Sequence, residues 1–249
     1  MTNHSETFPD LSPREAERLD RTLALLPNDV SNGLEIGFYD FRVSRRLLET
    51  MDLVSIDLPR PIQAHKEFKL AFADVQQLPF RDGAFDIVIC TEVLEHLPDS
   101  VLFRGIRELQ RVSRKYVLVS VPYRQRVWNE LFKCTNCGYV GHSMGHLRYI
   151  DEQDFPAMFD VATVETVQFI GRCDGYAPDW LYAIGNRLGN TWQDYCFGQC
   201  PRCGKADTTV APNPLGFVLQ RITWRVQRAV KSRPAWMLLL FKVASTSVD

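Results

Sequence analysis

Acidic residues accompany three short apolar segments in the first third of the chain. Glu35 lies in the first segment, Asp57 ends the second and Asp74 follows the third; the segments are 33–37, 54–57 and 68–73. A carboxylate only accepts hydrogen bonds, so each of these residues could bind a hydroxyl or amino group of a ligand. Open α/β sheets bind ligands at the carboxyl ends of their strands. We therefore expect the three acidic residues to lie near one another at one sheet edge.

Two Cys-x-x-Cys-Gly segments form a second chemical pattern. Cys134 and Cys137 make the first pair, and Cys200 and Cys203 make the second. Two thiolates at this spacing can turn toward one ion, and two such pairs complete a closed, structural zinc site. The 62 residues between the pairs are not an obstacle. Closing a long loop costs little beside the roughly 10 to 16 kcal/mol of structural zinc binding.

A second ligand set for the same metal is also compatible with the sequence. Cys134, Cys137, His142 and His146 have the spacing of a compact zinc knuckle. In that case Cys200 and Cys203 would be free or would form another site with Cys196. The sequence leaves both sets open. We interpret the other two cysteines, Cys90 and Cys173, as a small buried apolar residue and a loop thiol.

Alternating strands and helices must position these groups. The chain has 249 residues, enough for one large α/β domain with a small insert. The pattern predicts an α/β fold with a doubly wound, mostly parallel seven-stranded sheet. The expected strands are 34–37, 53–56, 68–73, 85–90, 116–121, 161–170 and 236–243, and the last should return to the sheet edge. Expected helices begin at Ser12-Pro13, span 100–112 and 152–159, and include an arginine-rich helix at 215–230.

These elements predict four regions. Residues 1–29 should form an N-terminal helix over the ligand site, and 30–170 the core. Residues 171–234, rich in glycine, proline and aromatic residues, should form an insert that completes the zinc site with 134–146. Residues 235–249 should carry the last strand.

Charge and hydropathy restrict the classes of partner. Lys and Arg number 29 against 30 Asp and Glu, a net charge of -1, so the overall field does not attract nucleic acid or anionic membranes. The N-terminus lacks the pattern of a secretory signal, and the longest apolar run, 235–241, is too short to span a bilayer. We therefore expect a cytoplasmic protein without a membrane span.

The segment from Leu78-Pro79-Phe80 to His96, with the three acidic strand ends, resembles a known family. It is similar to the class I methyltransferases that use S-adenosylmethionine, and most closely to the small-molecule, type 11 branch related to quinone biosynthesis. The resemblance covers about residues 30–125, with a weaker similarity to residue 170. It implies a methyltransferase sheet and S-adenosylmethionine as cofactor.

The resemblance also implies roles for individual residues. Asp57 would bind the ribose hydroxyls, and Asp74 the adenine amino group with the Val75 amide beside it. His96 would be the base if the acceptor is a hydroxyl, because the imidazole pKa is near neutrality. The start of the family's first motif and the wall beside the methionine part of the cofactor would be formed by Glu35, Gly37, Thr91 and Glu92.

One segment departs from the family pattern. Further small residues normally follow the first glycine, whereas here Tyr39 and Phe41 occupy those positions after Gly37. Either the loop moves outward or the pocket is partly filled.

Two functional hypotheses follow. The first is methyl transfer from S-adenosylmethionine to a small-molecule or glycan-type acceptor, with the acceptor pocket lined by aromatic and basic residues: Tyr123, Arg124, Tyr176, Trp180 and Tyr182. The alternative is a non-catalytic module whose zinc ribbon recognises RNA or a protein partner; nucleic acid is the less favoured partner. It is motivated by Tyr39 and Phe41 and by the arginines of 215–230, which could also contact phosphates or an anionic lipid surface.

Overall fold

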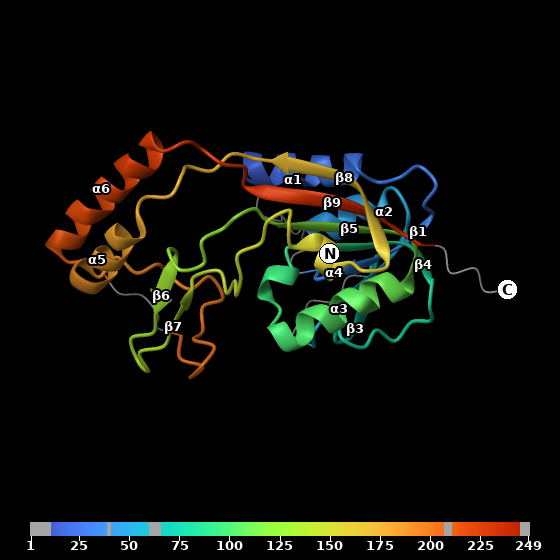
Figure 1. Ribbon diagram of the computed structural model, residues 1–249. Helices are drawn as coiled ribbons and strands as arrows, with labels where there is room; N and C mark the ends of the chain where they lie inside the picture. Colours follow the sequence, from blue (N-terminus) through green and yellow to red (C-terminus); the bar gives the residue numbers. More distant parts are fainter. Residues whose placement is uncertain (1–10, 39–40, 60–65, 207–210, 245–249) are drawn as a thin grey trace, which may run out of the picture. The chain divides into compact units, whose positions relative to one another are not determined.

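The computed structural model describes residues 11–38, 41–59, 66–206 and 211–244 (Figure 1). The chain divides into two compact units. The first comprises the residues up to Val121, Glu152–Gly171 and the residues from Trp236 onward. The second comprises Pro122–Asp151 and Arg172–Ala235, so the segment 122–151 groups with the insert.

The first unit contains the predicted seven-stranded sheet. Its strand order is β3-β2-β1-β4-β5-β9-β8. The five strands from β3 to β5 are parallel, and β8 and β9 are antiparallel to each other. The mostly parallel α/β fold is therefore confirmed. The strands are β1 (Asn32–Ile36), β2 (Asp52–Asp57), β3 (Lys69–Phe72), β4 (Phe85–Thr91), β5 (Ser113–Pro122), β8 (Ala162–Ile170) and β9 (Trp236–Val243).

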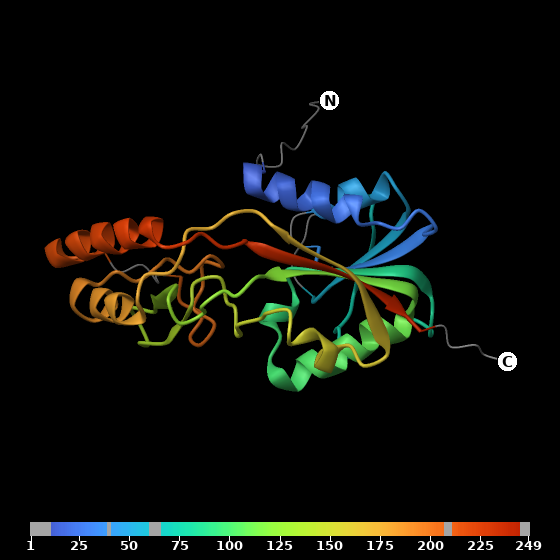
Figure 2. The ribbon, with the colours of Figure 1, turned by 45° about the horizontal axis from the view of Figure 1, so that its top comes forward.

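Helices cover both faces of this sheet, as Figure 2 shows, with α1 and α2 on one face and α3 on the other. Ser12 caps α1 through a capping box with Glu15, as the sequence predicts. Strand β4 is buried from Phe85 to Cys90, because both of its faces meet helices. The helical elements of this unit are α1 (Pro13–Ala24), α2 (Arg42–Leu48), the short 3-10 helix η1 (Leu94–His96), α3 (Asp99–Val112) and α4 (Phe155–Met158).

Two predictions about this unit are wrong in detail. The last strand, β9, lies between β5 and β8, so β8 forms the edge. The burial explains this position: Met237–Phe241 is buried throughout, whereas most of β8 is exposed or half-buried. The predicted helix 152–159 shortens to α4, since Val161 instead donates its amide to the Gln110 side chain.

The loop with Leu78-Pro79-Phe80 is fixed by two residues of α3. Glu108 accepts a 2.7 Å hydrogen bond from the Leu78 amide. Arg111 donates to the Phe80 carbonyl at 2.8 Å and the Leu78 carbonyl at 3.1 Å. The hydrogen bond from Arg111, at 2.6 Å, also holds the pKa of the Glu108 carboxyl below its usual value. The charged pair thus gives this loop a single conformation.

The second unit contains a β-hairpin and a pair of helices. The hairpin pairs β6 (Leu131–Lys133) with β7 (Val140–His142), and the helices are α5 (Asp179–Gly189) and α6 (Pro214–Ala229). The helices meet at Gly189 and Gly216, where a Cβ on Gly216 would lie 2.0 Å from the Gly189 carbonyl oxygen. Only α6 was predicted from the sequence. The hairpin strands are too short to give a periodic pattern.

Candidate functional site

The first acidic residue of the sheet edge is Glu35 in β1. Its side chain is 1% exposed, and its Oε2 accepts a 2.7 Å hydrogen bond from Ser55 Oγ in β2. The parallel register that pairs Glu35 with Ser55 brings these groups together. A buried carboxylate needs such a partner.

Gly37 forms the turn that follows β1. Its φ is +83°, and an added Cβ would lie 2.6 Å from Val93 Cγ2. Its amide donates to the Ile56 carbonyl oxygen at 2.8 Å. Only glycine adopts this conformation in so close a contact without strain. The close contact with Val93 therefore requires glycine at this position.

The aromatic residues after Gly37 pack among themselves. Phe41 is 7% exposed, and its ring centroid lies 4.7 Å from that of Phe68 and 5.1 Å from that of Phe38. The Phe41 ring therefore has its own apolar cluster. Tyr39 and Asp40, the other residues of this departure, lie outside the described residues.

Asp57 and Asp74 follow neighbouring strands. Asp57 ends β2 opposite Phe72, the last residue of β3, and Asp74 comes two positions later. The Leu58 amide donates to Asp57 Oδ1 at 2.8 Å, and the Gln76 amide to Asp74 Oδ1 at 2.9 Å. Asp57 is half-buried and Asp74 is exposed. Gln76 Nε2 also donates to Asp74 Oδ1 at 3.3 Å and Oδ2 at 3.1 Å, so the Gln76 side chain would have to turn away for a ligand to take its place.

Val75 and Thr91 are two further residues predicted to lie in the cofactor site. Val75 is 8% exposed and packs toward Gly105, where a Cβ would lie 3.2 Å from Val75 Cγ1. Thr91 is half-buried at the end of β4 and lines a pocket of about 40 Å³ with residues of α1 and α2. That volume is of the order of a few water molecules.

Glu92 connects three elements of the first unit. Its carboxylate accepts hydrogen bonds from Ser120 Oγ in β5 and Trp236 Nε1 in β9, both at 2.8 Å, and lies 3.1 Å from the Arg18 guanidinium of α1. Glu92 itself has a φ of 59°. Sequence reasoning found Glu92 but missed Arg18 and Trp236, which no local pattern marks.

His96 lies at the end of η1, beside a buried acid. Glu95 is 1% exposed, and one of its carboxylate oxygens lies within 4.8 Å of a ring nitrogen of His96. Cys90 is fully buried, and the loss of hydration together with Glu95 and Glu92 raises the pKa of its thiol well above the usual value. Cys90 is therefore a neutral, apolar residue, as its sequence context indicates.

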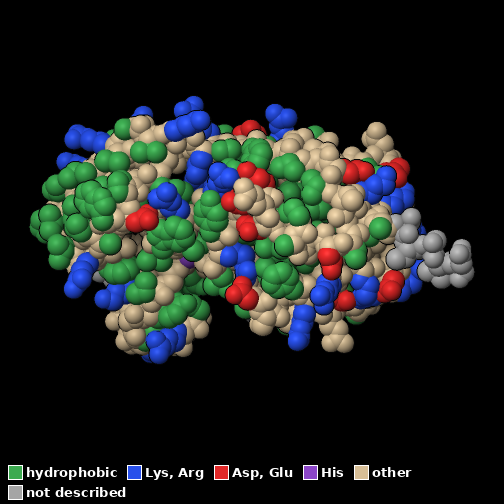
Figure 3. Space-filling model, in the orientation of Figure 1, with side chains coloured by type: hydrophobic (Ala, Val, Ile, Leu, Met, Phe, Trp, Pro, Cys, Tyr) green, Lys and Arg blue, Asp and Glu red, His purple; other side chains and the backbone are tan. Residues whose placement is uncertain are grey.

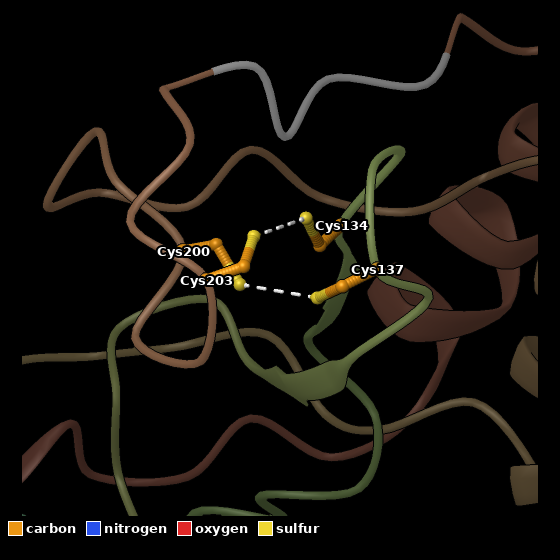
Figure 4. A group of neighbouring side chains, drawn as sticks. All are labelled: Cys134, Cys137, Cys200 and Cys203. Atoms are coloured by element: carbon orange, nitrogen blue, oxygen red, sulfur yellow. Dashed lines mark hydrogen bonds between the residues drawn. The ribbon is translucent and has the colours of Figure 1, made fainter.

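The four cysteines of the two pairs gather in the second unit (Figure 4). Cys134 Sγ lies 3.7 Å from Cys203 Sγ, and Cys137 Sγ lies 3.7 Å from Cys200 Sγ. All four sulfur atoms lie within 4.8 Å of one another. A zinc ion with bonds of about 2.3 Å separates tetrahedral sulfur ligands by about 3.8 Å, whereas a disulfide is about 2.05 Å long. The spacing fits a metal and excludes disulfides among these four.

The two cysteine segments have the same local structure. In the first, the Gly138 amide donates to the Cys134 carbonyl at 3.0 Å; in the second, the Gly204 amide donates to Cys200 at 2.8 Å. The two glycines have φ values of +68° and +69°. Each turn directs two thiols to one point, and this is why both segments end in glycine.

The alternative ligand set is not assembled. The sulfur cluster comprises the four cysteines and neither His142 nor His146. His142 Nδ1 instead accepts the amides of Met144 and His146 at 3.3 Å, and its Nε2 lies 3.5 Å from a Glu130 oxygen. The structure therefore favours the four-cysteine set.

A second cavity lies wholly in the second unit, with a volume of about 390 Å³. Its walls include Trp128, Phe132, Tyr139, His142, His146 and Tyr195. The His146 ring stacks on His142, and its Nδ1 contacts Gln125 Oε1. Gln125 in turn donates to Glu130 at 3.0 Å.

The aromatic residues expected to line an acceptor pocket lie elsewhere in this unit. Tyr176 packs between the guanidinium groups of Arg126 and Arg233, at 5.2 and 4.5 Å from its ring centroid. Burial raises the pKa of the Tyr176 hydroxyl to about 12. Tyr182 accepts a hydrogen bond from Gln227, and Trp180 is 62% exposed. None of these residues lines the cavity beside Trp128.

Residues 34–121 match a family model described as a methyltransferase domain. The match covers 88 of the 249 residues. The matched segment contains β2, β3 and β4 and most of β1 and β5, with Glu35, Gly37, Asp57, Asp74, Thr91 and Glu92 at or near their ends. A relative from Methanocaldococcus jannaschii, an uncharacterized protein, is 32% identical over 87 residues, which are 33% of this chain and 39% of that protein. The matched part is thus less than half of the relative's length.

Solved structures share the fold of this chain. A SAM-dependent methyltransferase from Archaeoglobus fulgidus aligns with a TM-score of 0.55 and 13% identity, over 90% of this chain and 91% of that chain. One from Methanosarcina mazei gives 0.50 and 12%, over 94% and 98%. The [4+2]-cyclase SpnF gives 0.53 and 13%, over 96% and 84%. At these identities the likeness concerns the fold alone. The family match over residues 34–121 supports a methyltransferase and does not favour the alternative of a non-catalytic module.

No helix in the described part of the chain is both long and apolar enough to cross a lipid bilayer.

Proposed function

We propose that the protein transfers a methyl group from S-adenosylmethionine to a small-molecule or glycan-type acceptor. The observation that carries the proposal is the joint arrangement of Gly37, Asp57 and Asp74 at the ends of adjacent parallel strands. Asp57 would bind the ribose hydroxyls, and Asp74 with the Val75 amide would bind the adenine. Glu35 and Gly37 would shape the turn beside the methionine part, with Thr91 and Glu92 on the other side.

The donor set fits this cofactor. Carboxylates accept from hydroxyl and amino groups, which the ribose and adenine present, and the turn at Gly37 has no Cβ to obstruct a close approach. When bound, S-adenosylmethionine supplies an electrophilic methyl group on a sulfonium. The protein's residues then align the acceptor and exclude water, which is worth about 7 to 11 kcal/mol in favourable cases. A hydroxyl acceptor also loses its proton, and we assign its removal to His96.

Calorimetric titration of S-adenosylmethionine into Asp57→Asn and Asp52→Asn variants tests the cofactor site. Asp52 begins the same strand at its opposite end and pairs with Lys69 at 2.5 Å, so it is a matched control. Losing a hydrogen bond to a charged group costs about 1.5 to 3 kcal/mol, so Asp57→Asn should bind roughly ten to a hundred times more weakly. Equal affinities in the two variants, or no binding by the wild type, would contradict the proposal.

We also propose that Cys134, Cys137, Cys200 and Cys203 bind a structural zinc ion. The four thiols form a closed tetrahedral donor set, which leaves no open position for a substrate. Native mass spectrometry should therefore find one zinc ion per chain in the wild type and none in Cys200→Ser. Cys196→Ser changes a neighbouring exposed cysteine outside the cluster and should keep the zinc. A wild-type protein that purifies without zinc from zinc-supplemented cells would exclude the site.

The acceptor would be recognised by the second unit. Its cavity of about 390 Å³ has the volume and the aromatic lining typical of small-ligand sites. Trp128, 47% exposed, offers a flat face to a ring or a sugar. With an acceptor identified by product mass, Trp128→Ala should raise its KM with little change in the affinity for S-adenosylmethionine. An unchanged KM would place acceptor binding elsewhere.

A further inference from the structure

The pair of helices in the second unit carries a large exposed apolar surface. Eight large hydrophobic side chains on α5 and α6 have between 39% and 62% of their surface exposed. We call this set the α5–α6 surface: Trp180, Ile184, Leu188, Leu215, Phe217, Val218, Ile222 and Trp224. Figure 3 shows hydrophobic side chains gathered over these helices, with lysine and arginine side chains along the edge of the area. Soluble proteins rarely expose so many apolar groups together unless the surface binds something.

The exposed side chains lie on one side of each helix. In α5, Trp180, Ile184 and Leu188 are four residues apart and form one stripe. In α6 the opposite side is used for packing: Gly216 is buried against Gly189, and Gln227 donates to Tyr182 at 2.7 Å. The exposed side of α6 is therefore free of the packing that fixes the two helices together. On this exposed half of α6 the arginines lie between two apolar flanks, Phe217 with Trp224 on one and Leu215 with Ile222 on the other, so apolar and cationic groups are interspersed.

The charge on α6 is of one sign. Arg221, Arg225 and Arg228 are exposed on the same side as Phe217 and Trp224, and Lys231 follows the helix. From Pro214 to Arg233 the chain contains no Asp or Glu. The Arg228 guanidinium lies 4.7 Å above the Trp224 ring, an arrangement in which the stem covers apolar surface and the charge stays at the polar boundary. This local charge contrasts with the net charge of -1 of the whole chain.

We propose that the α5–α6 surface binds the headgroup region of an anionic lipid bilayer. Tryptophan, phenylalanine and aliphatic side chains would enter the boundary between headgroups and acyl chains, while the arginines would contact the lipid phosphates. The protein would then lie on the membrane without spanning it. The proposal does not depend on the methyltransferase activity or on the zinc site.

Two other occupants fit the charges less well. A second copy placed by two-fold symmetry would face its own Arg221, Arg225 and Arg228 with the same arginines, and like charges at such a contact repel. Nucleic acid would pair with the arginines, but it offers no apolar surface for Ile184, Leu188 and Ile222. An anionic bilayer offers acyl chains to the apolar side chains and phosphates to the arginines.

Sedimentation with lipid vesicles tests the proposal on the full-length protein. One set of vesicles is pure phosphatidylcholine and the other an equimolar mixture of phosphatidylcholine and phosphatidylglycerol. The wild type should sediment with the mixed vesicles only, and added salt should weaken the binding. The double variant Phe217→Ser, Trp224→Ser should lose most of the binding. Arg221→Gln, Arg225→Gln and Arg228→Gln together should lower it at least tenfold.

Matched variants on α3 serve as controls. Phe103→Ser removes another exposed aromatic side chain, which is 50% exposed, and Arg104→Gln with Arg107→Gln removes exposed charges. These variants should bind like the wild type. Circular dichroism and an unchanged thermal unfolding midpoint would establish that the α6 variants are folded.

Three results would overturn the proposal. The first is a folded wild type that binds neither type of vesicle. The second is binding that persists undiminished in the Phe217→Ser, Trp224→Ser variant. The third is light scattering that shows a dimer for the wild type without lipid and a monomer for this variant, because the surface would then be covered by a second copy.

Discussion

Trp236, the first residue of β9, donates from its indole nitrogen to the Glu92 carboxylate at 2.8 Å, although 144 residues separate them. The same carboxylate contacts Arg18 of α1, whose guanidinium lies 5.1 Å above the Trp236 ring. The N-terminal helix, the end of β4 and the start of β9 therefore share one polar contact. This contact fixes the positions of residues on both sides of the proposed cofactor site.

Replacing Trp236 with Phe should destabilise the protein by about 1 to 3 kcal/mol, because it leaves one Glu92 oxygen without its donor. Chemical denaturation monitored by circular dichroism measures the free energy of unfolding. Trp224→Phe is the control, since Trp224 is 52% exposed and should change the stability little. Equal stabilities of the two variants would show that the Glu92 contact is not important for folding.

The charged pair on α3 predicts a pH dependence of stability. The pKa of Glu108 is lowered in the folded protein, first of all by the hydrogen bond from Arg111. Its stabilising contribution is therefore present above the unfolded pKa of about 4.3 and is lost as the pH falls through the folded pKa. In Glu108→Gln this loss should be absent, so the wild type should lose more stability than the variant on acidification. Denaturation midpoints at several acidic pH values test this, and parallel curves would contradict it.

Removing the proposed zinc ion should affect the second unit. Phe132 forms a small apolar cluster with two of the four cysteines, Cys134 and Cys200. Tyr139 and Tyr195 pack against this cluster. A chelator should expose these tyrosines and remove the protection of the β6–β7 hairpin, as measured by hydrogen exchange. The sheet of the first unit has its own core around Leu53, Ile87 and Leu238 and should keep its protection. Loss of protection in both units together would mean that they unfold as one.

The sequence was sufficient for features that depend on local patterns. Strand β9 was predicted with its observed bounds because Met237–Phe241 is continuously apolar, and the cysteine pairs were found by their spacing. It was not sufficient where stability comes from distant contacts. Strands β6 and β7 have three residues each and depend on the core at Phe132. Helix α5 contains two glycines of low helix propensity, Gly185 and Gly189, and only the structure shows that Gly185 lies against Thr191 and Gly189 against Gly216 of α6.

The candidate site shows the same division. Asp57 and Asp74 could be placed at adjacent strand ends because each follows an apolar run. The partners Arg18 and Trp236 of Glu92 could not, because no periodicity relates α1 to β9. The Phe41 ring could not be placed either, since it packs on Phe68, a residue just before β3 that no local pattern relates to Phe41.

Alanine substitutions at two glycines with left-handed backbone would distinguish backbone strain from a steric clash of the added Cβ. Gly37 and Gly83 have φ values of +83° and +58°. A Cβ at Gly37 would lie 2.6 Å from Val93 Cγ2, whereas at Gly83 the nearest atom, in Arg114, is 3.7 Å away. Gly83→Ala should therefore lower the free energy of unfolding only by the cost of backbone strain, about 1 to 2 kcal/mol. Gly37→Ala should lower the free energy of unfolding further, because its Cβ would also clash with Val93. It should also weaken the binding of S-adenosylmethionine, because the turn beside the ligand must shift. Denaturation of both variants would measure the two effects on stability, and calorimetric titration would measure the affinity for S-adenosylmethionine. An unchanged affinity in Gly37→Ala would show that this turn is not part of the cofactor site.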